Sequence, residues 1–172
     1  MVACFIGHRT ITVTNELCER IRTTVLDLID NQGVDTFLFG SRSQFDELCL
    51  KIVTEIKETR PHIRRIYVRA EYPYISTDYE KYLLTFYDET YMPENIIHAG
   101  KAIYIERNRH MIDSSDICIF YYTENASHHH SHTIVPSGTK LAYHYGLSKQ
   151  NIIINLFPSV SIMHYSGFHR TI

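Results

Sequence analysis

The sequence opens with a short apolar segment that ends at a glycine, and this feature constrains the fold more than any other. Val2 to Ile6 is a continuous apolar run, and Gly7, His8 and Arg9 follow it. Such a run is typical of a strand buried on both faces at the centre of a parallel sheet. A helical pattern begins a few residues later. The chain therefore predicts a strand, a glycine-containing turn and a helix, the unit with which nucleotide-binding α/β domains usually begin.

Length and composition restrict the class of protein. A chain of 172 residues is expected to form a single domain over residues 1–172. Its 17 Lys and Arg residues against 19 Asp and Glu residues provide no basic field, which argues against nucleic-acid binding. No apolar run approaches the roughly 18–20 residues of a membrane span. We therefore expect a cytoplasmic protein that does not enter a membrane.

Cysteines and histidines raise the question of a metal site. Cys4, Cys18, Cys49 and Cys118 are widely spaced within apolar patterns, which predicts buried free thiols and neither a disulfide framework nor a zinc site. The histidines at positions 128–132 could bind zinc or nickel weakly, but Glu124 is the one acidic residue near them. A polar loop is the favoured interpretation, and no metal or cofactor is expected.

Strand and helix patterns alternate along the rest of the chain. Strands are expected at residues 36–39, 63–70, 117–122 and 151–156, and helices at residues 14–31, 43–60, 78–91, 106–114 and 141–148. Ser43 and Asp46 resemble a capping box, and residues 96–98 and 102–104 form a short strand or an irregular loop. This alternation predicts an α/β protein, a Rossmann-like three-layer fold whose mostly parallel sheet has helices on both faces.

Glycines and polar residues follow several of these strands. Ligands of such sheets bind outside the carboxyl ends of the strands, so these residues should meet at one edge. The groups are Gly7-His8-Arg9, Gly40-Ser41-Arg42, Glu71 and Gly138-Thr139. Arg9 and Arg42 end neighbouring strands, and a guanidinium matches phosphate oxygens. Arg107 and Arg109 add to this charge or form a solvated helix face.

Ser137-Gly138-Thr139-Lys140 is the most distinctive short motif. It starts a helix, whose free amides attract phosphate, and its glycine lets a ligand approach the backbone. Thr139 adds a hydroxyl and Lys140 a charge. An ordinary helix cap with a turn glycine is an equally good interpretation of this stretch alone. The spacing is not that of a Walker loop.

Taken together, four motifs resemble one family. They are Phe5-Ile6-Gly7-His8-Arg9, Phe37-Leu38-Phe39-Gly40 with Phe45-Asp46, residues 107–113 with Ser115-Asp116, and Ser137-Gly138-Thr139. In order and spacing they resemble the SLOG superfamily, which includes the DprA and Lonely Guy Rossmann-like proteins, and within it the YpsA-like branch. The resemblance extends from Cys4 to about Leu156.

The resemblance implies a nucleotide or nucleotide-derived ligand at the strand ends. Lonely Guy phosphoribohydrolases carry Pro-Gly-Gly-x-Gly-Thr followed by two glutamates, one of them catalytic. Here Pro136-Ser137-Gly138-Thr139 keeps the phosphate-binding half, whereas Leu141 and Ala142 take the places of the glutamates. The arginine of that family's helix is matched by Arg107, four residues before Met111.

The expected function follows from these residues and from the resemblance. The protein is expected to bind a nucleotide, including a second messenger, as a sensor or sequestering protein. The alternative is a nucleoside or nucleotide N-glycosidase, similar to the phosphoribohydrolases, that uses Glu71 or Asp46. The expected partners are this small-molecule nucleotide and further copies of the chain, in a dimer or larger homo-oligomer. The expected binding residues are Gly7, His8, Arg9, Gly40, Ser41, Arg42, Phe45, Asp46, Glu71, Arg107, Met111, Ser137, Gly138, Thr139 and Lys140.

Overall fold

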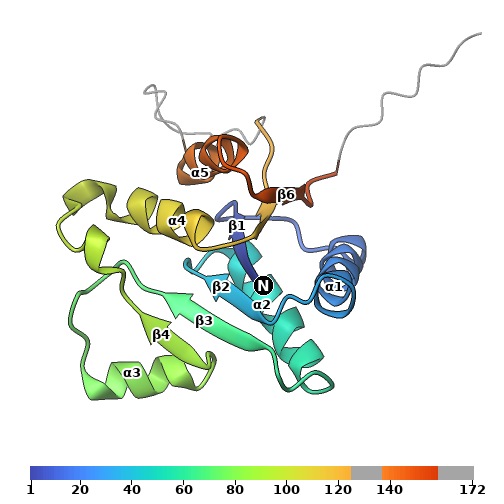
Figure 1. Ribbon diagram of the computed structural model, residues 1–172, viewed down its shortest axis with the longest axis horizontal. Helices are drawn as coiled ribbons and strands as arrows, with labels where there is room; N and C mark the ends of the chain where they lie inside the picture. The colour runs from blue at the N-terminus through green and yellow to red at the C-terminus, as the bar shows by residue number, and fades with distance from the viewer. Residues whose placement is uncertain (125–136, 159–172) are drawn as a thin grey trace, which may run out of the picture.

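The computed structural model of the chain describes residues 1–124 and 137–158. Its centre is a six-stranded sheet in the order β4-β3-β2-β1-β5-β6, in which every neighbouring pair is parallel (Figure 1). The strands are β1 (Val2–Gly7), β2 (Thr36–Phe39), β3 (Arg64–Val68), β4 (Glu89–Tyr91), β5 (Ile117–Tyr121) and β6 (Ile152–Asn155).

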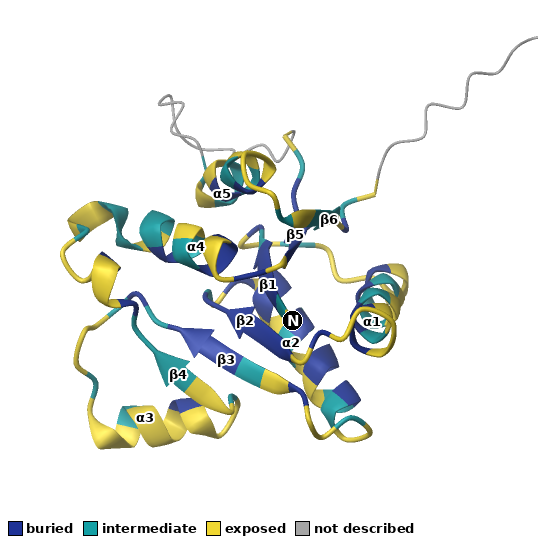
Figure 2. Ribbon diagram, in the orientation of Figure 1, coloured by how far each residue is buried: buried dark blue, intermediate teal, exposed yellow. Residues whose placement is uncertain are grey.

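Helices cover both faces of the sheet, so the fold has three layers. The helices are α1 (Asn15–Asp30), α2 (Gln44–Lys57), α3 (Thr77–Leu84), α4 (Ile103–Asp113) and α5 (Gly138–Leu147). The buried side chains of α1, α2 and α3 form one core with one face of the sheet, and those of α4 and α5 form a second core with the other. Figure 2 shows the central strands β1, β2 and β5 as mostly buried, whereas the edge strands β4 and β6 are more exposed. The predicted α/β Rossmann-like architecture is therefore confirmed.

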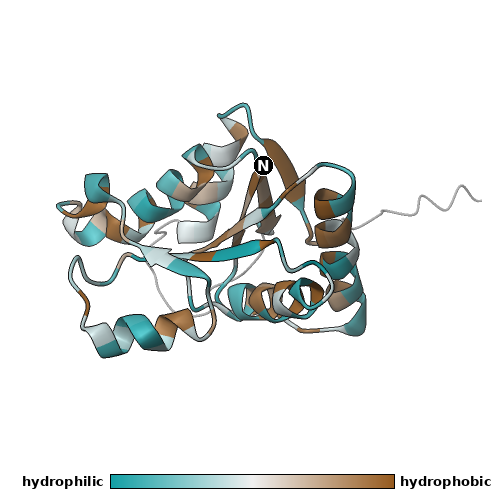
Figure 3. Cartoon of the chain, turned by 60° about the horizontal axis from the view of Figure 1, so that its bottom comes forward, coloured by the Kyte–Doolittle hydropathy of each residue, from teal (hydrophilic) through white to brown (hydrophobic). Residues whose placement is uncertain are grey.

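The alternation of apolar and polar residues explains why α1 forms where it does. Thr14 caps the helix, since its Oγ1 accepts a hydrogen bond from the amide of Leu17. The predicted apolar face is the buried one, and it consists of Leu17, Ile21, Val25, Leu28 and Ile29. In Figure 3 the hydrophobic residues gather on the strands and on the sides of the helices that face them.

The start of α2 differs from the predicted capping box in one respect. Ser43 Oγ accepts a hydrogen bond from the amide of Asp46, as expected for a cap. In a capping box the carboxylate of Asp46 would return to the amide of Ser43, but that amide donates to Ser41 Oγ. The carboxylate instead accepts from the amides of Gly40 and Ser41. Asp46 therefore holds the turn after β2 and does not complete the box.

Two predicted elements between β3 and β5 were wrong. Of the helix expected at residues 78–91, only the part within α3 (Thr77–Leu84) forms. Residues 89–91 form the edge strand β4, which pairs with β3. Asp88 directs this pairing, because its carboxylate accepts a hydrogen bond from the amide of Arg65. Residues 102–104 form no strand: Ile103 and Tyr104 begin α4, after two 3-10 turns at Glu94–Ile96 and Gly100–Ala102. Short apolar runs do not distinguish these alternatives by periodicity.

Free cysteines lie in the core of the sheet. Cys4 and Cys118 are partners in the β1–β5 register, and both are fully buried, as is Cys49 on α2. The hydrogen bond between the thiols of Cys4 and Cys118, together with burial, raises the pKa of Cys4. Burial raises the pKa of Cys49. Cys18 is half-buried. The prediction of free thiols is confirmed, with Cys18 less buried than expected.

None of the helices within residues 1–124 and 137–158 combines the length and apolar composition that crossing a membrane requires.

Candidate functional site

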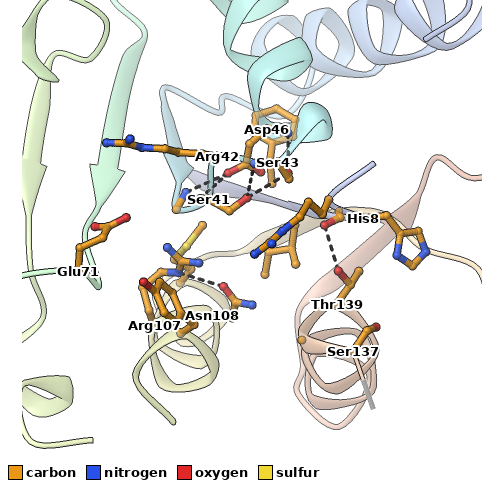
Figure 4. A pocket seen from close by; sticks show the side chains of 18 residues that line it. His8, Ser41, Arg42, Ser43, Asp46, Glu71, Arg107, Asn108, Ser137 and Thr139 are labelled. Carbon is orange, nitrogen blue, oxygen red and sulfur yellow. Dashed lines mark hydrogen bonds between the residues drawn. The ribbon is translucent and has the colours of Figure 1, made fainter. Parts of the chain in front are cut away.

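A cavity lies at the carboxyl edge of the sheet, where residues that follow β1, β2 and β3 meet residues of α4 and α5. From β1 the chain builds the sheet outward to β4 and then returns to place β5 on the other side of β1. This reversal leaves a crevice, the usual ligand site of such sheets. The cavity has a volume of about 830 Å³. In Figure 4 it lies between Arg107 of α4 and Thr139 of α5, with Asp46 of α2 along a third side.

Most of the predicted binding residues line this cavity. They are Gly7, His8, Arg9, Gly40, Ser41, Arg42, Asp46, Glu71, Arg107, Met111, Ser137, Gly138 and Thr139. Phe45 does not line it, because its ring is fully buried beneath Gly7. Lys140 does not line it either. Its ammonium lies 3.9 Å from a carboxylate oxygen of Glu124 instead.

Five of the lining residues were not among the predicted binding residues. Phe5 and Ile6 belong to the central strand, Ser43 caps α2, and Tyr104 and Asn108 lie on α4. Asn108 adjoins Arg107 and could have been included on that ground. Tyr104 lies three residues before Arg107, almost one helical turn. It was missed because the predicted helix began at residue 106.

One side of the cavity, which we call the buried wall, consists of Gly40, Asp46, Arg107 and Met111. Arg107 is only 3% exposed. Its Nε donates to Asn108 Oδ1 at 3.0 Å, and its Nη1 contacts the carbonyl of Val68 at 3.5 Å. Within the described ranges no carboxylate lies within 4.0 Å of its nitrogens, and burial lowers the pKa of the guanidinium. The buried wall thus holds a cation without an anionic partner in direct contact.

Asp46 is the acidic member of the buried wall and is 2% exposed. Its Oδ2 accepts hydrogen bonds from the amides of Ser41, at 2.6 Å, and Gly40, at 3.3 Å. Its Oδ1 is buried without a hydrogen-bond partner among the residues described. Burial raises the pKa of Asp46 from 3.8 to about 6, although the two amides and the charge of Arg107 act in the opposite direction. Asp46 can therefore exchange a proton near neutral pH.

Two glycines permit close packing around the buried wall. A Cβ on Gly40 would lie 2.5 Å from Met111 Sδ and 2.8 Å from Arg107 Cδ. A Cβ on Gly7 would lie 2.2 Å from a ring carbon of Phe45. All three distances are shorter than any normal contact with a side chain. Gly7 and Gly40 were predicted as binding residues. Both line the cavity, and their lack of a side chain makes room for Phe45, Met111 and Arg107.

The opposite side, which we call the open wall, consists of Arg9, Ser137, Gly138 and Thr139. Ser137 Oγ accepts a hydrogen bond from the amide of Lys140 and caps α5. Thr139 Oγ1 donates to the carbonyl of Gly7 at 3.0 Å, which ties α5 to β1. A Cβ on Gly138 would meet no atom of the described residues within 4 Å, its chain neighbours aside. Ser137 therefore forms the helix cap, and the first amides of α5 remain beside an open space.

The remaining predicted residues have partners within the protein. His8 Nε2 accepts a hydrogen bond from the amide of Thr123, and in Figure 4 its ring points away from Arg107. Arg42 donates to the hydroxyl of Tyr79 on α3. Glu71 Oε1 accepts from the hydroxyl of Tyr67 at 2.9 Å. These bonds fix the side chains at the rim of the cavity.

Arg109 is exposed and paired with Glu106 on the same helix, at 2.8 Å. It belongs to the solvated face of α4 and not to the cavity. The histidines at 128–132 lie outside the described residues. Within the described residues, no group of three or more His, Cys, Asp or Glu side chains is arranged to hold a metal ion.

Comparisons with known proteins return no match: no protein-family model matches the chain, and a search of curated proteins finds no significant relative.

Proposed function

We propose that the protein binds a nucleotide or nucleotide-derived ligand, which includes nucleotide second messengers, in the cavity at the carboxyl edge of the sheet, and that it acts as a sensor or sequestering protein. The observation that carries this proposal is Arg107, a guanidinium 3% exposed that lines the cavity without a carboxylate in direct contact among the described residues. The proposal includes membership of the YpsA-like branch of the SLOG superfamily.

The energetics of a buried charge support an anionic ligand. Removing an ion from water costs several kcal/mol unless a partner offsets the loss. Asn108 and the carbonyl of Val68 supply only neutral acceptors to Arg107. The bound phosphate would supply the direct anionic contact that no described residue makes, through the paired hydrogen bonds that a guanidinium makes best.

The open wall supports a second contact with the same anion. The amides of Gly138 and Thr139 begin a ten-residue helix, whose positive end attracts phosphate. Arg9 is exposed and lines the cavity beside them. The cavity volume of about 830 Å³ falls within the range of about 300–1,000 Å³ typical of small-molecule sites.

The second candidate function is hydrolysis of an N-glycosidic bond, and the position of Glu71 favours it. Its carboxylate lines the cavity and is only half-buried, so it can reach a bound sugar. Asp46 is less suitable, because two backbone amides already hold one of its carboxylate oxygens. The first turn of α5 offers Lys140, Leu141 and Ala142, none of which is acidic.

The decisive test is to denature the purified protein and identify any released nucleotide by mass spectrometry. Calorimetric titration with AMP, NAD, ADP-ribose and a cyclic dinucleotide follows, with free base measured by chromatography. We expect binding without release of base. Base release at several turnovers per minute, abolished by Glu71→Gln, would establish the glycosidase instead.

Arg107→Met isolates the residue that carries the proposal. It should weaken nucleotide binding by about 1.5–3 kcal/mol, the scale of a hydrogen bond to a charged group. It should change the free energy of unfolding by only about 1 kcal/mol, because replacing a buried ion by an apolar side chain is often neutral. Arg109→Met, two residues along the same helix, is the matched control and should bind as the wild type does. Equal affinity in both variants would contradict the proposal.

A further inference from the structure

Tyr104 is a large aromatic residue that the structure leaves exposed inside the cavity. Its side chain is 54% exposed, although it lines the same cavity as Arg107. Tyr72, Tyr74 and Tyr82 are also more than half exposed, but none of them lines this cavity. Among the described residues, Tyr104 is therefore the large exposed apolar side chain that a ligand in the cavity would meet.

The ring of Tyr104 is held in a defined place. It is the second residue of α4, whose later turns are anchored in the core by the fully buried Met111 and Ile112. The guanidinium carbon of Arg107 lies 5.9 Å from the centroid of the ring. This is within the range of a cation–π contact, so the ring and the buried cation form one unit. Much of the ring surface remains exposed.

We propose that Tyr104 is the stacking platform for the heteroaromatic ring of the ligand, whose anionic group lies against Arg107. This inference rests on the proposed function and names the ligand class: a compound in which a planar base and a phosphate lie close together. Stacking removes the exposed ring surface from water and adds the attraction between two π-systems. A sugar phosphate without a base would use only the anionic half of the site.

The proposal separates affinity from base selectivity. Every base has a π-face, so stacking on an aromatic side chain tolerates many sequences and bases. Tyr104 should therefore strengthen the binding of purine and pyrimidine nucleotides alike. Any discrimination between bases would come from polar groups at the rim, among which Glu71 and Asn108 line the cavity.

The absence of tryptophan from the chain makes a direct test possible. Tyr104→Trp introduces a single indole at the proposed platform, and stacking of a base on it should quench its fluorescence. Tyr82→Trp is the matched control, because Tyr82 is 55% exposed on α3 and does not line the cavity. We expect AMP, GMP and NAD to quench the first variant only. Ribose 5-phosphate should bind to both and quench neither.

Calorimetry on Tyr104→Ala measures the contribution of the ring. The affinity for AMP, GMP and NAD should fall about five- to 150-fold, the range that stacking of one base provides, whereas the affinity for ribose 5-phosphate should not change. Tyr104→Phe should bind as the wild type does. Nucleotide binding that is unchanged in Tyr104→Ala, or lost equally for ribose 5-phosphate, would overturn this inference alone. A wild type that binds none of these compounds would overturn the proposed function as well.

Discussion

The two walls of the cavity are built in opposite ways. The side chains of the buried wall, Asp46 and Arg107 above all, are 2% and 3% exposed and are packed around Gly40 before any ligand arrives. In the open wall, the hydroxyls of Ser137 and Thr139 are already used within the protein. What that wall offers to a ligand is the backbone of α5 and the exposed side chain of Arg9.

This difference implies that the two walls respond differently to substitution. In the buried wall, the same atoms hold the fold and face the cavity, so a change that disturbs their packing should alter stability and binding together. In the open wall, the atoms that face the cavity support little else, so a change there should alter binding alone. Equivalent substitutions on the two sides separate these outcomes.

The largest expected effect is that of Gly40→Val. Its Cβ would lie within 2.8 Å of atoms of both Met111 and Arg107, so the buried wall must shift. We expect a loss of about 3 kcal/mol in the free energy of unfolding, the upper part of the usual range for overpacking. Urea denaturation followed by circular dichroism measures it.

Gly138→Val is the matched substitution in the open wall. Its Cβ meets none of the described atoms beyond its chain neighbours within 4 Å, so the free energy of unfolding should change by no more than about 0.5 kcal/mol. The added side chain enters the space beside the first amides of α5, and nucleotide affinity should fall by at least about tenfold, or 1.4 kcal/mol. If Gly138→Val were the less stable variant, the contrast between the walls would be wrong.

Asp46 of the buried wall should make the free energy of unfolding depend on pH. Because burial raises its pKa from 3.8 to about 6, the folded protein retains a proton that the unfolded chain releases. Asp46 therefore adds stability that is complete below pH 3.8 and is lost as the pH rises through about 6. Relative to Asp46→Asn, the free energy of unfolding of the wild type should fall by about 2–3 kcal/mol between pH 4 and pH 7.

Urea titrations of both proteins at several pH values measure this difference. The Asn variant corrects for every other group that titrates in the same range, provided that those groups are unaffected by the substitution. A difference between the two proteins that stays constant from pH 4 to pH 7 would show that Asp46 has an ordinary pKa and that the buried wall does not perturb it.

Arg9→Ala is a second test of the open wall. It should weaken nucleotide binding by about 1.5 kcal/mol, the lower part of the range for a hydrogen bond to a charged group, and leave the melting temperature unchanged. Salt screens exposed charges over about 8 Å at physiological ionic strength, but screens buried ones much less. The decrease in affinity with added salt should therefore be smaller in Arg9→Ala than in Arg107→Met. The reverse order would contradict the assignment of the two arginines.

The sequence predicted the parts of the fold that local patterns determine. The buried face of α1 and the caps at Thr14, Ser43 and Ser137 follow from spacing and side-chain chemistry, and the structure bears them out. It did not predict β4. This strand depends on pairing with β3 and on the bond from Arg65 to Asp88, which no local pattern encodes.

Topology predicted the edge of the sheet at which the cavity lies, but the residue types did not predict the contacts around it. Gly7 and Gly40 were predicted as binding residues, and the sequence did not show that they also make room for Phe45, Met111 and Arg107. Whether a glycine faces a ligand or a side chain depends on tertiary packing. Tyr104 was missed for a related reason, because the start of α4 is not evident from its apolar residues.

The paired cysteines in β1 and β5 allow the separation of these two strands to be followed by thiol modification. Thiol reagents must reach the sulfur atom to react, and Cys4, Cys49 and Cys118 are all buried. Cys18 is half-buried and should be modified first. The later reaction of Cys4 and Cys118 requires their two strands to separate. The rate of this reaction therefore reports how often β1 and β5 separate, without any added label.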